Sequence, residues 1–500
     1  MLLKELLKDI PVLECTANPE QEITAICYDS RKAEPGCLFV AVSGFAADGN
    51  RFIPMAREKG AAAVVTAKKP EGEVPYVLVE SDRLALALLG CNFYANPSRS
   101  MTMIGVTGTN GKTSSTLLLK QVLEKTLGAK VGLVGTMANM IGEEIVPTER
   151  TTPESLDLQA LFARMRDAGC THVVMEVSSH AVTLERIGGI HFNVAAFTNL
   201  TEDHLDFHKT MDAYCDAKAE LFRRCDKAVV NVDDAYADRI LAAAACPVLT
   251  TSVAKAEGLH AENVELHAEG ISFTAICGEE RAEVKLPIPG RFTVYNALTV
   301  LGIARQLGIS ISDCAEALKT AQGVKGRVEV VPTPETPYSV LIDYAHTPDG
   351  LENVLRSVRD FCKGRLICVF GCGGDRDPMK RPIMGKIGVE LSDIAVITSD
   401  NPRTENPMAI IEDIVKGVNP EDGEYIVIED RRAAIRYAMD IAEKNDIIVL
   451  AGKGHETYQD IGGHKHHLDE REEVEPHCNN HLKNLVLLGL FLSGSNSTKL

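Results

Sequence analysis

Short, unbroken apolar runs alternate with longer amphipathic stretches through the middle and last thirds of the chain, and this alternation limits the possible folds most strongly. Helical spacing fills the intervals, as at 156–168 and 432–443. Strands that are apolar at every position belong to parallel sheets covered by helices on both faces. Both thirds are therefore predicted to be doubly wound α/β folds. The strand-like runs are 101–106, 172–177, 194–198, 228–232, 339–342, 366–370, 394–398 and 447–450.

Two turn-rich stretches divide the chain into three predicted domains. Residues 96–100 precede the first strand-like run, and the proline-rich stretch 332–337 precedes the run at 339–342. A length of 500 residues also fits about three domains. We predict domains at 1–98, 99–331 and 332–500.

Composition and charge exclude several classes of protein. The chain is 45% hydrophobic with a net charge of -18, and an acidic chain repels nucleic-acid backbones. No apolar run, including 485–492 near the C-terminus, reaches the ~20 residues of a membrane span. Charged residues within 4–9 interrupt a signal-peptide core.

The 14 cysteines contain no CxxC pair and are expected to be reduced thiols of a cytoplasmic protein.

Nearly every glycine-rich or polar segment of the last two domains follows a predicted strand. Open α/β sheets bind ligands beyond the carboxyl ends of their strands. Each of these domains is therefore predicted to carry one functional edge. Two such edges suggest a site for two substrates in the cleft between the domains.

The segment Gly108-Thr-Asn-Gly-Lys-Thr113 joins a strand-like run to a predicted helix at 114–126. Glycines let backbone N–H groups turn toward phosphate, and a helix N-terminus favours anions. Lys112 is predicted to reach the β- and γ-phosphates, and Thr113 to offer its hydroxyl to Mg²⁺. A plain strand–turn–helix junction is the alternative. The residues predicted to bind ATP are Gly108, Thr109, Asn110, Gly111, Lys112, Thr113 and Ser114.

Two neighbouring strand ends add carboxylates and imidazoles. Glu176 is placed to bind Mg²⁺ directly or through water, although a solvated strand end is the simpler interpretation of the residue alone. The Ser-Ser-His that follows and Arg186 suit an anionic substrate. Segment 202–208 contains two histidines and three acids, which favours a site over isolated structural residues.

Lys218 lies on a predicted helix within 214–222. Its residue type and position alone predict an exposed lysine on a helix surface. The local pattern therefore assigns it no function.

The last domain carries groups that suit an amino acid. Arg403 ends the segment Asp400-Asn-Pro-Arg403, and its planar guanidinium matches a carboxylate through two hydrogen bonds. Pro402 sets the turn before it. Arg376 offers a second guanidinium, and Glu456 in Gly452-Lys-Gly-His-Glu456 offers a carboxylate for an ammonium group. These groups predict an amino-acid pocket, with surface ion pairs as the alternative.

Nine motifs, in chain order, resemble those of the Mur ligases of peptidoglycan synthesis. The motifs are GTNGKT, EVSSH, NLTEDHLDFH, YCDAKAELF, GRFTVYNA, IDYAHTPDGL, FGCGGDRD, SDNPRTE and AGKGHE, within roughly residues 20–475. The resemblance implies a smaller N-terminal α/β domain that binds a UDP-sugar. It also implies a central P-loop ATPase domain with a parallel or mixed sheet, and a C-terminal Rossmann-like domain that binds an amino acid.

The resemblance also implies roles for single residues. It implies that Asn296, Arg327 and Asp343 help hold the nucleotide. The UDP-sugar dipeptide is expected to contact Ser30, Thr151, Thr152, Ser178 and Arg186. The incoming amino acid is expected to contact Arg376, Asp400, Asn401, Pro402, Arg403, Gly452 and Glu456.

In this resemblance Lys218 is carbamylated by CO₂ and binds a second Mg²⁺ together with His204. The implied catalytic residues are Lys112, Lys218, His204 and Glu176. The implied metal ligands are Thr113, Glu176, His204 and Lys218.

The reaction implied by the resemblance joins an acid to an amine through an acyl phosphate. ATP phosphorylates the D-glutamyl γ-carboxylate of UDP-N-acetylmuramoyl-L-alanyl-D-glutamate, and meso-2,6-diaminopimelate attacks with its amine. Arg403 suits the second carboxylate of diaminopimelate, which lysine lacks. A lysine-adding Mur ligase, a folylpolyglutamate synthetase-like ligase and a nucleotide-dependent switch are the alternatives. We expect a cytoplasmic monomer with no nucleic-acid partner and no membrane span.

Overall fold

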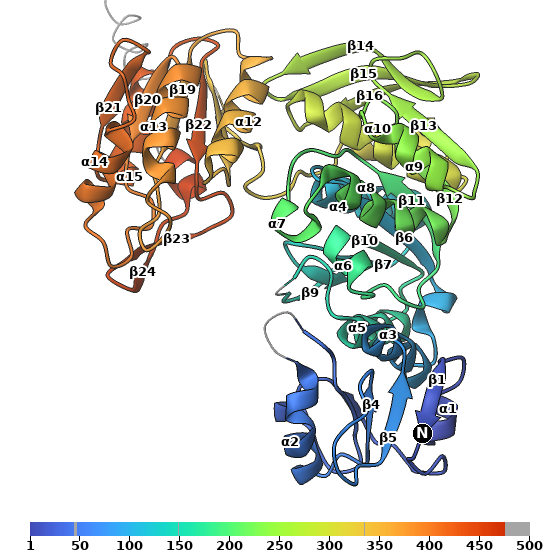
Figure 1. The fold of residues 1–500 in the computed structure, drawn as a ribbon. Coiled ribbons are helices and arrows are strands. Elements are labelled where there is room, and N and C mark those ends of the chain that lie inside the picture. Colours follow the sequence, from blue (N-terminus) through green and yellow to red (C-terminus); the bar gives the residue numbers. More distant parts are fainter. Residues whose placement is uncertain (45–47, 149, 335, 476–500) are drawn as a thin grey trace, which may run out of the picture. The chain divides into compact units, whose positions relative to one another are not determined.

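The computed structural model describes residues 1–475 except 45–47, 149 and 335 (Figure 1). The apolar stretch at 485–492 lies outside the described residues. The chain divides into two compact units, and each contains segments that are distant in sequence. The first unit contains Met1–Ala261, Ala275–Ala282 and Tyr295–Ala317. The second contains Glu262–Thr274, Glu283–Val294 and the chain from Leu318 onward.

A five-stranded sheet with order β1-β5-β4-β3-β2 forms the N-terminal part of the first unit. Its strands are parallel except β1, which pairs antiparallel with β5. The strands are β1 (Val12–Cys15), β2 (Ile26–Cys27), β3 (Leu38–Val40), β4 (Ala63–Thr66) and β5 (Tyr76–Val79). The helices are α1 (Leu3–Leu6), η1 (Ser30–Lys32), η2 (Gly49–Phe52), α2 (Ile53–Glu58), α3 (Asp82–Phe93) and η3 (Pro97–Ser100).

An eleven-stranded mixed sheet follows, with order β16-β15-β14-β13-β12-β11-β6-β10-β7-β8-β9. Its strands are β6 (Thr102–Thr107), β7 (Val131–Val134), β8 (Asn139–Ile141), β9 (Glu144–Val146), β10 (His172–Glu176), β11 (Phe192–Phe197), β12 (Cys225–Asn231), β13 (Val248–Ser252), β14 (Leu259–His267), β15 (Gly270–Cys277) and β16 (Glu280–Leu286). Its helices are α4 (Lys112–Leu127), α5 (Ser155–Asp167), α6 (Ser179–Thr183), α7 (Leu205–His208), α8 (Met211–Ala219), η4 (Glu220–Arg223), α9 (Ala237–Ala243), α10 (Arg291–Gln306) and α11 (Ile311–Leu318). Helix α5 packs beside α3 of the N-terminal part (Figure 1).

The order of the central strands determines which loops meet. Strand β6 lies between β10 and β11, and all three run parallel. Their carboxyl ends therefore share one edge, where Glu176 pairs in register with Val106 and Phe197 with Thr107. This arrangement brings the segment after β6 between the segments that follow β10 and β11.

The second unit contains a six-stranded sheet with order β17-β18-β22-β19-β20-β21, parallel except for β17. Alternate strand residues pack into two separate cores, as Leu341 and Val340 do, so the sheet is buried on both faces as predicted. Helices α12, α13 and α14 cover one face and α15 the other. The strands are β17 (Glu329–Val331), β18 (Ser339–Asp343), β19 (Leu366–Phe370), β20 (Ile394–Ile397), β21 (Glu424–Val427) and β22 (Ile447–Ala451). The helices are α12 (Pro348–Arg359), α13 (Lys380–Leu391), α14 (Pro407–Val415) and α15 (Arg431–Ile441).

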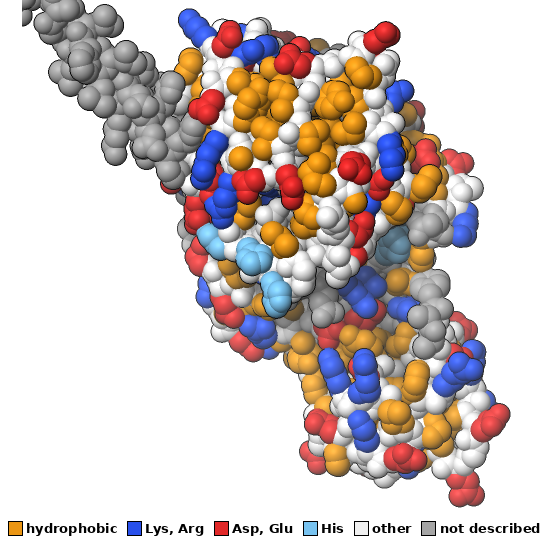
Figure 2. All heavy atoms as spheres, turned by 90° about the vertical axis from the view of Figure 1, so that its left-hand side faces the viewer, with side chains coloured by type: hydrophobic (Ala, Val, Ile, Leu, Met, Phe, Trp, Pro, Cys, Tyr) orange, Lys and Arg blue, Asp and Glu red, His pale blue; other side chains and the backbone are white. Residues whose placement is uncertain are grey.

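A hairpin of β23 (Tyr458–Ile461) and β24 (His464–His467) follows β22. Every residue of β24 is exposed, and three of its four residues are histidines. Figure 2 shows histidine side chains close together on the surface. The sheets of five, eleven and six strands, with their helices, confirm the predicted α/β fold class. Within the described residues, no helix is both long and apolar enough to cross a membrane.

Candidate active site

The loop between β6 and α4 requires glycine at two positions. Gly108 has φ +150°, and a Cβ atom there would lie 1.9 Å from the Thr198 hydroxyl oxygen. Gly111 has φ +84°, and a Cβ there would lie 2.5 Å from Asn296 Oδ1. The loop therefore packs closely against the end of β11 and against α10. Its last glycine leads directly into the 16-residue helix α4, whose first N–H groups favour an anion.

Lys112 is the first residue of α4 and turns back over this loop. Its Nζ donates to the carbonyl oxygens of Gly108, at 2.8 Å, and Thr109, at 2.7 Å. Burial lowers the pKa of Lys112, and the nearby carboxylates of Glu176 and Asp203 partly oppose this effect. The loop thus holds a cation where the P-loop prediction places the phosphates.

Glu176 is buried at the end of β10, with 1% of its surface exposed. Its Oε1 accepts from the backbone N–H of Thr136 at 2.9 Å and its Oε2 from the Thr136 hydroxyl at 3.1 Å. The Thr136 hydroxyl also lies 3.0 Å from that of Thr151. The residue is therefore not a solvated strand end, and one hydroxyl links it to the predicted substrate residue Thr151.

The donor set suits Mg²⁺ only in combination with phosphate. Among the described residues, no three histidine, cysteine, aspartate or glutamate side chains come together as a metal site. Mg²⁺ commonly takes one or two protein ligands and completes its shell with phosphate oxygens and water. Glu176 and the Thr113 hydroxyl fit that kind of site.

Lys218 on α8 is buried, with 1% of its surface exposed, so the exposed helix lysine that its residue type alone predicts is wrong. Its Nζ donates to Gly108 O at 2.8 Å and lies 4.4 Å from the centre of the Tyr214 ring. Burial lowers the pKa of Lys218 well below its ordinary value of 10.5, and the positive charge of Lys112 lowers it further. The Tyr214 hydroxyl lies 3.2 Å from that of Thr109, so this aromatic ring connects Lys218 to the loop.

His204 lies near the same tyrosine ring. Its φ of 54° is left-handed, and its backbone N–H donates to Asp203 Oδ1 at 2.8 Å. Its imidazole is exposed and meets Tyr214 edge-on, with ring centres 6.0 Å apart. His204 and Lys218 therefore both flank Tyr214.

The predicted dipeptide-binding residues form a second group on this unit. Thr152 donates its hydroxyl to Glu176 O at 2.9 Å, and Arg186 Nη1 donates to Thr152 O at 3.2 Å. The Ser178 hydroxyl caps α6 by accepting from Ala181 N–H at 3.2 Å. Arg186 also pairs with Glu154, 3.5 Å away. Thr152 and Arg186 are thus joined to Glu176 and Glu154, and Ser178 joins them through its backbone N–H, which donates to the Thr152 hydroxyl at 3.3 Å.

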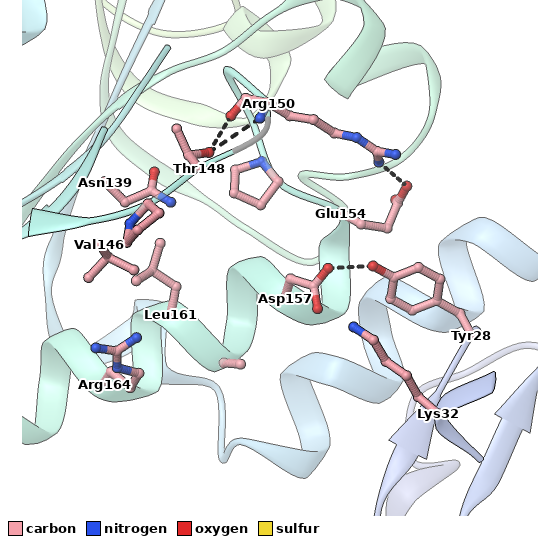
Figure 3. A pocket seen from close by; sticks show the side chains of 13 residues that line it. Tyr28, Lys32, Asn139, Val146, Thr148, Arg150, Glu154, Asp157, Leu161 and Arg164 are labelled. Carbon is pink, nitrogen blue, oxygen red and sulfur yellow. Dashed lines mark hydrogen bonds and ion pairs between the residues drawn. The ribbon is translucent and has the colours of Figure 1, made fainter. Parts of the chain in front are cut away.

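A pocket of about 470 Å³ opens beside this group (Figure 3). In Figure 3, Tyr28 and Lys32 approach from the N-terminal part, and Tyr28 donates its hydroxyl to Asp157 on α5. Ser30 lies between them in sequence, but its hydroxyl contacts Met55 Sδ at 3.3 Å and it does not line this pocket. The pocket is lined by Tyr28, Lys32, Asn139, Val146, Pro147, Thr148, Arg150, Pro153, Glu154, Asp157, Ala160, Leu161 and Arg164.

The predicted amino-acid residues meet at the carboxyl edge of the second unit's sheet. Asn401 Nδ2 donates to Glu456 Oε2 at 2.9 Å. Arg403, with φ 51°, donates from Nη1 to Gly374 O at 2.7 Å, which holds its guanidinium beside the segment that carries Arg376. Arg376 itself is exposed. The turn at Asp400–Pro402 and the Gly452 turn lie together, because a Cβ at Gly452 would approach Asp400 Oδ2 to 2.6 Å.

The residues predicted to hold the nucleotide divide between the two units. Asn296 belongs to the first unit, whereas Arg327 and Asp343 belong to the second. Asp343 accepts backbone N–H bonds from Val328 and Ala345, both at 2.8 Å. Burial raises the pKa of Asp343. Arg327 lies over the Tyr344 ring, 5.6 Å from its centre.

Sequence reasoning missed several residues that support these groups. Thr136 and Glu154 lie in segments without a distinctive local pattern, so only tertiary contact reveals them. Tyr214 lies in the motif YCDAKAELF, but its contacts with Thr109 and Lys218 appear only in the structure. Lys453, in contrast, lies between Gly452 and Glu456 in a motif already singled out. A lysine between two glycines at a strand end could have drawn attention to it.

Family models match three segments of the chain. They are the Mur ligase family catalytic domain at 22–93, the Mur ligase middle domain at 106–304 and the Mur ligase glutamate ligase domain at 326–454. The chain is 49% identical over 462 residues to the UDP-N-acetylmuramoyl-L-alanyl-D-glutamate–2,6-diaminopimelate ligase of Clostridium botulinum, which covers 91% of this chain and 95% of that protein. The chain belongs to the Mur ligase family. The resemblance of its motifs is thereby confirmed.

Other Mur ligases align over nearly the whole chain. The ligase of the same name from Clostridium tetani is 48% identical, covering 95% of this chain and 99% of its own. A solved structure of a ligase of that name is 31% identical with a TM-score of 0.77, covering 96% of this chain and 99% of that chain. The folylpolyglutamate synthase of Mycobacterium tuberculosis is 18% identical with a TM-score of 0.56, covering 74% of this chain and 92% of that chain. It therefore shares the fold alone.

Proposed function

We propose that this Mur ligase is an ATP-dependent enzyme that adds meso-2,6-diaminopimelate to the D-glutamyl γ-carboxylate of UDP-N-acetylmuramoyl-L-alanyl-D-glutamate. The observation that carries the proposal is identity of 48–49%, over more than nine-tenths of the chain, to two ligases named for these compounds. Those alignments are long enough to include both the P-loop edge and the Arg403 edge.

In this proposal the P-loop edge binds ATP. The N-terminal N–H groups of α4 and the Lys112 ammonium neutralise the β- and γ-phosphates. Thr113 and Glu176 hold Mg²⁺, which when bound supplies charge neutralisation for the transferred phosphoryl group. Asn296 supports the loop through its contact with Gly111. Arg327 and Asp343 complete the proposed nucleotide contacts.

The D-glutamyl acid binds beside the P-loop edge. Thr151, Thr152, Ser178 and Arg186 are proposed to orient it, and Ser30 to contact the UDP-sugar. The link Thr151–Thr136–Glu176 supports this assignment, because it couples a substrate residue to the proposed magnesium ligand. The γ-carboxylate oxygen attacks the γ-phosphorus of ATP, and ADP leaves.

Lys218 is proposed to react with CO₂. A neutral amine forms the new N–C bond and loses a proton to solvent, which leaves an anionic carbamate. The buried position of Lys218 beside Lys112 supports the neutral amine. The carbamate is an anion, whereas the lysine that it replaces is a cation. Together with His204, it would therefore hold a second Mg²⁺.

The amine of diaminopimelate then attacks the acyl carbon, and phosphate leaves. The second unit's edge is proposed to hold the far amino-acid head, with Arg403 on its carboxylate and Glu456 on its ammonium group. Arg376, Asp400, Asn401, Pro402 and Gly452 complete that proposed pocket. Lysine would leave the Arg403 guanidinium without its carboxylate, which disfavours it.

We also propose three domains with limits at 1–98, 99–331 and 332–500. Three family segments match, at 22–93, 106–304 and 326–454, and the last begins six residues before the proposed limit at 332. A cytoplasmic, monomeric enzyme fits a reaction between nucleotide-linked and free metabolites.

Isotope transfer tests the acyl-phosphate route directly. The dipeptide substrate is labelled with ¹⁸O in the D-glutamyl γ-carboxylate and turned over with ATP and diaminopimelate. One ¹⁸O is expected in each phosphate released, because that oxygen bridges the acyl carbon and phosphorus before the amine attacks. Unlabelled phosphate would show that ATP hydrolysis does not activate this acid.

A further inference from the structure

We propose that Lys453 is a positioning residue that orders Asn401 and Glu456 to recognise the ammonium group of the far amino-acid head. The inference rests on the proposed function of this edge. Lys453 follows β22 and is completely buried, with 0% of its surface exposed. A buried cation must be paired, and its partners here are two residues proposed to bind substrate.

The Lys453 ammonium group reaches both partners at once. Its Nζ lies 3.1 Å from Asn401 Oδ1 and 3.2 Å from Glu456 Oε2, and 5.6 Å from the centre of the Tyr458 ring. Asn401 Nδ2 closes the triangle by donating to the same Oε2 of Glu456 at 2.9 Å. Lys453, Asn401 and Glu456 therefore form one hydrogen-bonded triad.

The triad determines which way the Asn401 amide faces. A lysine ammonium group and a backbone N–H can only donate, and both Lys453 and Asp460 N direct their hydrogens at Asn401 Oδ1, the latter at 2.9 Å. The amide oxygen is thereby fixed toward Lys453 and Asp460, so the NH₂ group faces Glu456. One of its hydrogens binds Glu456, which leaves the other for a substrate carboxylate.

The same contacts orient Glu456. Among the described residues, the hydrogen bonds to its carboxylate all use Oε2, so Oε1 is left to accept from an ammonium group. The Glu456 side chain is 16% exposed, so solvent alone does not hold it in place. Lys453 holds this carboxylate in one direction before substrate arrives, which reduces the ordering that binding requires.

An N–H donor beside a free carboxylate oxygen complements the carboxylate and ammonium groups of one amino-acid head. The wild-type enzyme should therefore prefer diaminopimelate to 2-aminopimelate, which keeps the attacking amine and the far carboxylate but lacks the far ammonium group. That preference depends on Glu456 Oε1, and hence on Lys453.

The test measures kcat/KM for the two amino acids in the wild-type enzyme and in Lys453→Met. Methionine has a side chain of similar length to lysine but no charge and no N–H donors. The ratio of kcat/KM for diaminopimelate over 2-aminopimelate is expected to fall by about 10- to 100-fold. The KM values for ATP and for the dipeptide should remain within about 2-fold of wild type, because those ligands bind elsewhere. Lys453→Gln, which keeps N–H donors and is the milder change, is measured in parallel and should lose part of the ratio.

Lys120 offers a matched control. It is also buried, 3% exposed, and also bridges two groups, Glu124 and Glu143. Lys120→Met should lower thermal stability but leave the amino-acid ratio unchanged. The double variant Lys453→Met/Glu456→Gln should lose no more of the ratio than Glu456→Gln alone, because both changes affect the same ammonium contact.

The inference is overturned if folded Lys453→Gln or Lys453→Met keeps the wild-type ratio of kcat/KM for the two amino acids. It is also overturned if kcat/KM falls equally for diaminopimelate and for 2-aminopimelate. Failure of the proposed function looks different: the wild-type enzyme would then show no phosphate release or calorimetric binding with diaminopimelate. In that outcome the inference falls with it.

Discussion

Lys112 and Lys218 donate to the same acceptor, the carbonyl oxygen of Gly108, each with its Nζ 2.8 Å away. Two ammonium groups so close in a partly buried place repel each other. The cost falls on Lys218, whose pKa is lowered well below its ordinary range by burial and by the charge of Lys112. In the proposed mechanism Lys112 is the cation that faces the phosphates, and its charge favours the neutral form of Lys218 that reacts with CO₂.

Replacement of Lys218 tests whether its nitrogen is used. Lys218→Ala is expected to lower kcat/KM by at least about 100-fold, because a metal-binding anion disappears from the phosphoryl-transfer site. High bicarbonate should not restore activity. Lys386→Ala, an exposed helix lysine of the second unit, is the control and should retain full activity.

Carbon NMR with ¹³CO₂ provides a direct readout of the same residue. Wild type should show one carbamate signal that is missing from Lys218→Ala and present in Lys386→Ala. Full activity of Lys218→Ala, or an identical spectrum, would refute the carbamate.

The lowered pKa of Lys218 predicts how stability depends on pH. Between its folded pKa and 10.5, the unfolded chain binds a proton that the folded chain does not, so stability rises with pH across this window. Lys218→Met removes that contribution. In CO₂-free buffer, urea unfolding of wild type should therefore gain more stability between neutral pH and pH ~10 than the variant does. Equal gains would mean that Lys218 keeps an ordinary pKa.

Arg403 should control discrimination between diaminopimelate and lysine. Its guanidinium is held by Gly374 O at 2.7 Å, so its direction is fixed before substrate binds. Arg403→Ala is expected to reduce kcat/KM for diaminopimelate by about 10- to 100-fold and to change the value for lysine little. Steady-state phosphate release with each amino acid measures both. A parallel loss for both would assign Arg403 to structure alone.

Breaking the buried pair of Arg431 and Glu470 should strongly destabilise the second unit. Both side chains are 0% exposed and 2.8 Å apart, and Arg431 also donates to Ala451 O at the end of β22. Arg431→Met leaves the buried Glu470 carboxylate without its partner. The free energy of unfolding, measured with urea, is expected to fall by about 3–5 kcal/mol. Arg356→Ala, which breaks an exposed pair with Glu352, should cost under about 1 kcal/mol.

Much of the fold was predictable because its strands are buried on both faces. The run predicted at 366–370 coincides with β19, and that at 447–450 with β22 apart from its last residue, Ala451. Ala451 and other terminal residues depend on pairing with neighbours, so the predicted ends differ by a residue or more. The two-residue strand β2 has too few residues to show any period.

The environment of the site residues was less predictable. Lys218 has the sequence context of an exposed helix residue, and it is buried because α8 packs beneath the loop at Gly108. No local pattern encodes that contact between residues 110 positions apart. Lys453 was overlooked for a related reason: its role depends on Asn401, 52 positions away.

The most direct measurement is phosphate release by the purified full chain with ATP, Mg²⁺ and the UDP-muramoyl dipeptide, when either diaminopimelate or lysine is added. We predict release that depends on diaminopimelate, with kcat/KM at least about 100-fold above that for lysine, and a product whose mass includes diaminopimelate. Equal rates with both amino acids would contradict the assignment of the Arg403 edge. ATP hydrolysis indifferent to any amino acid would contradict the ligase itself.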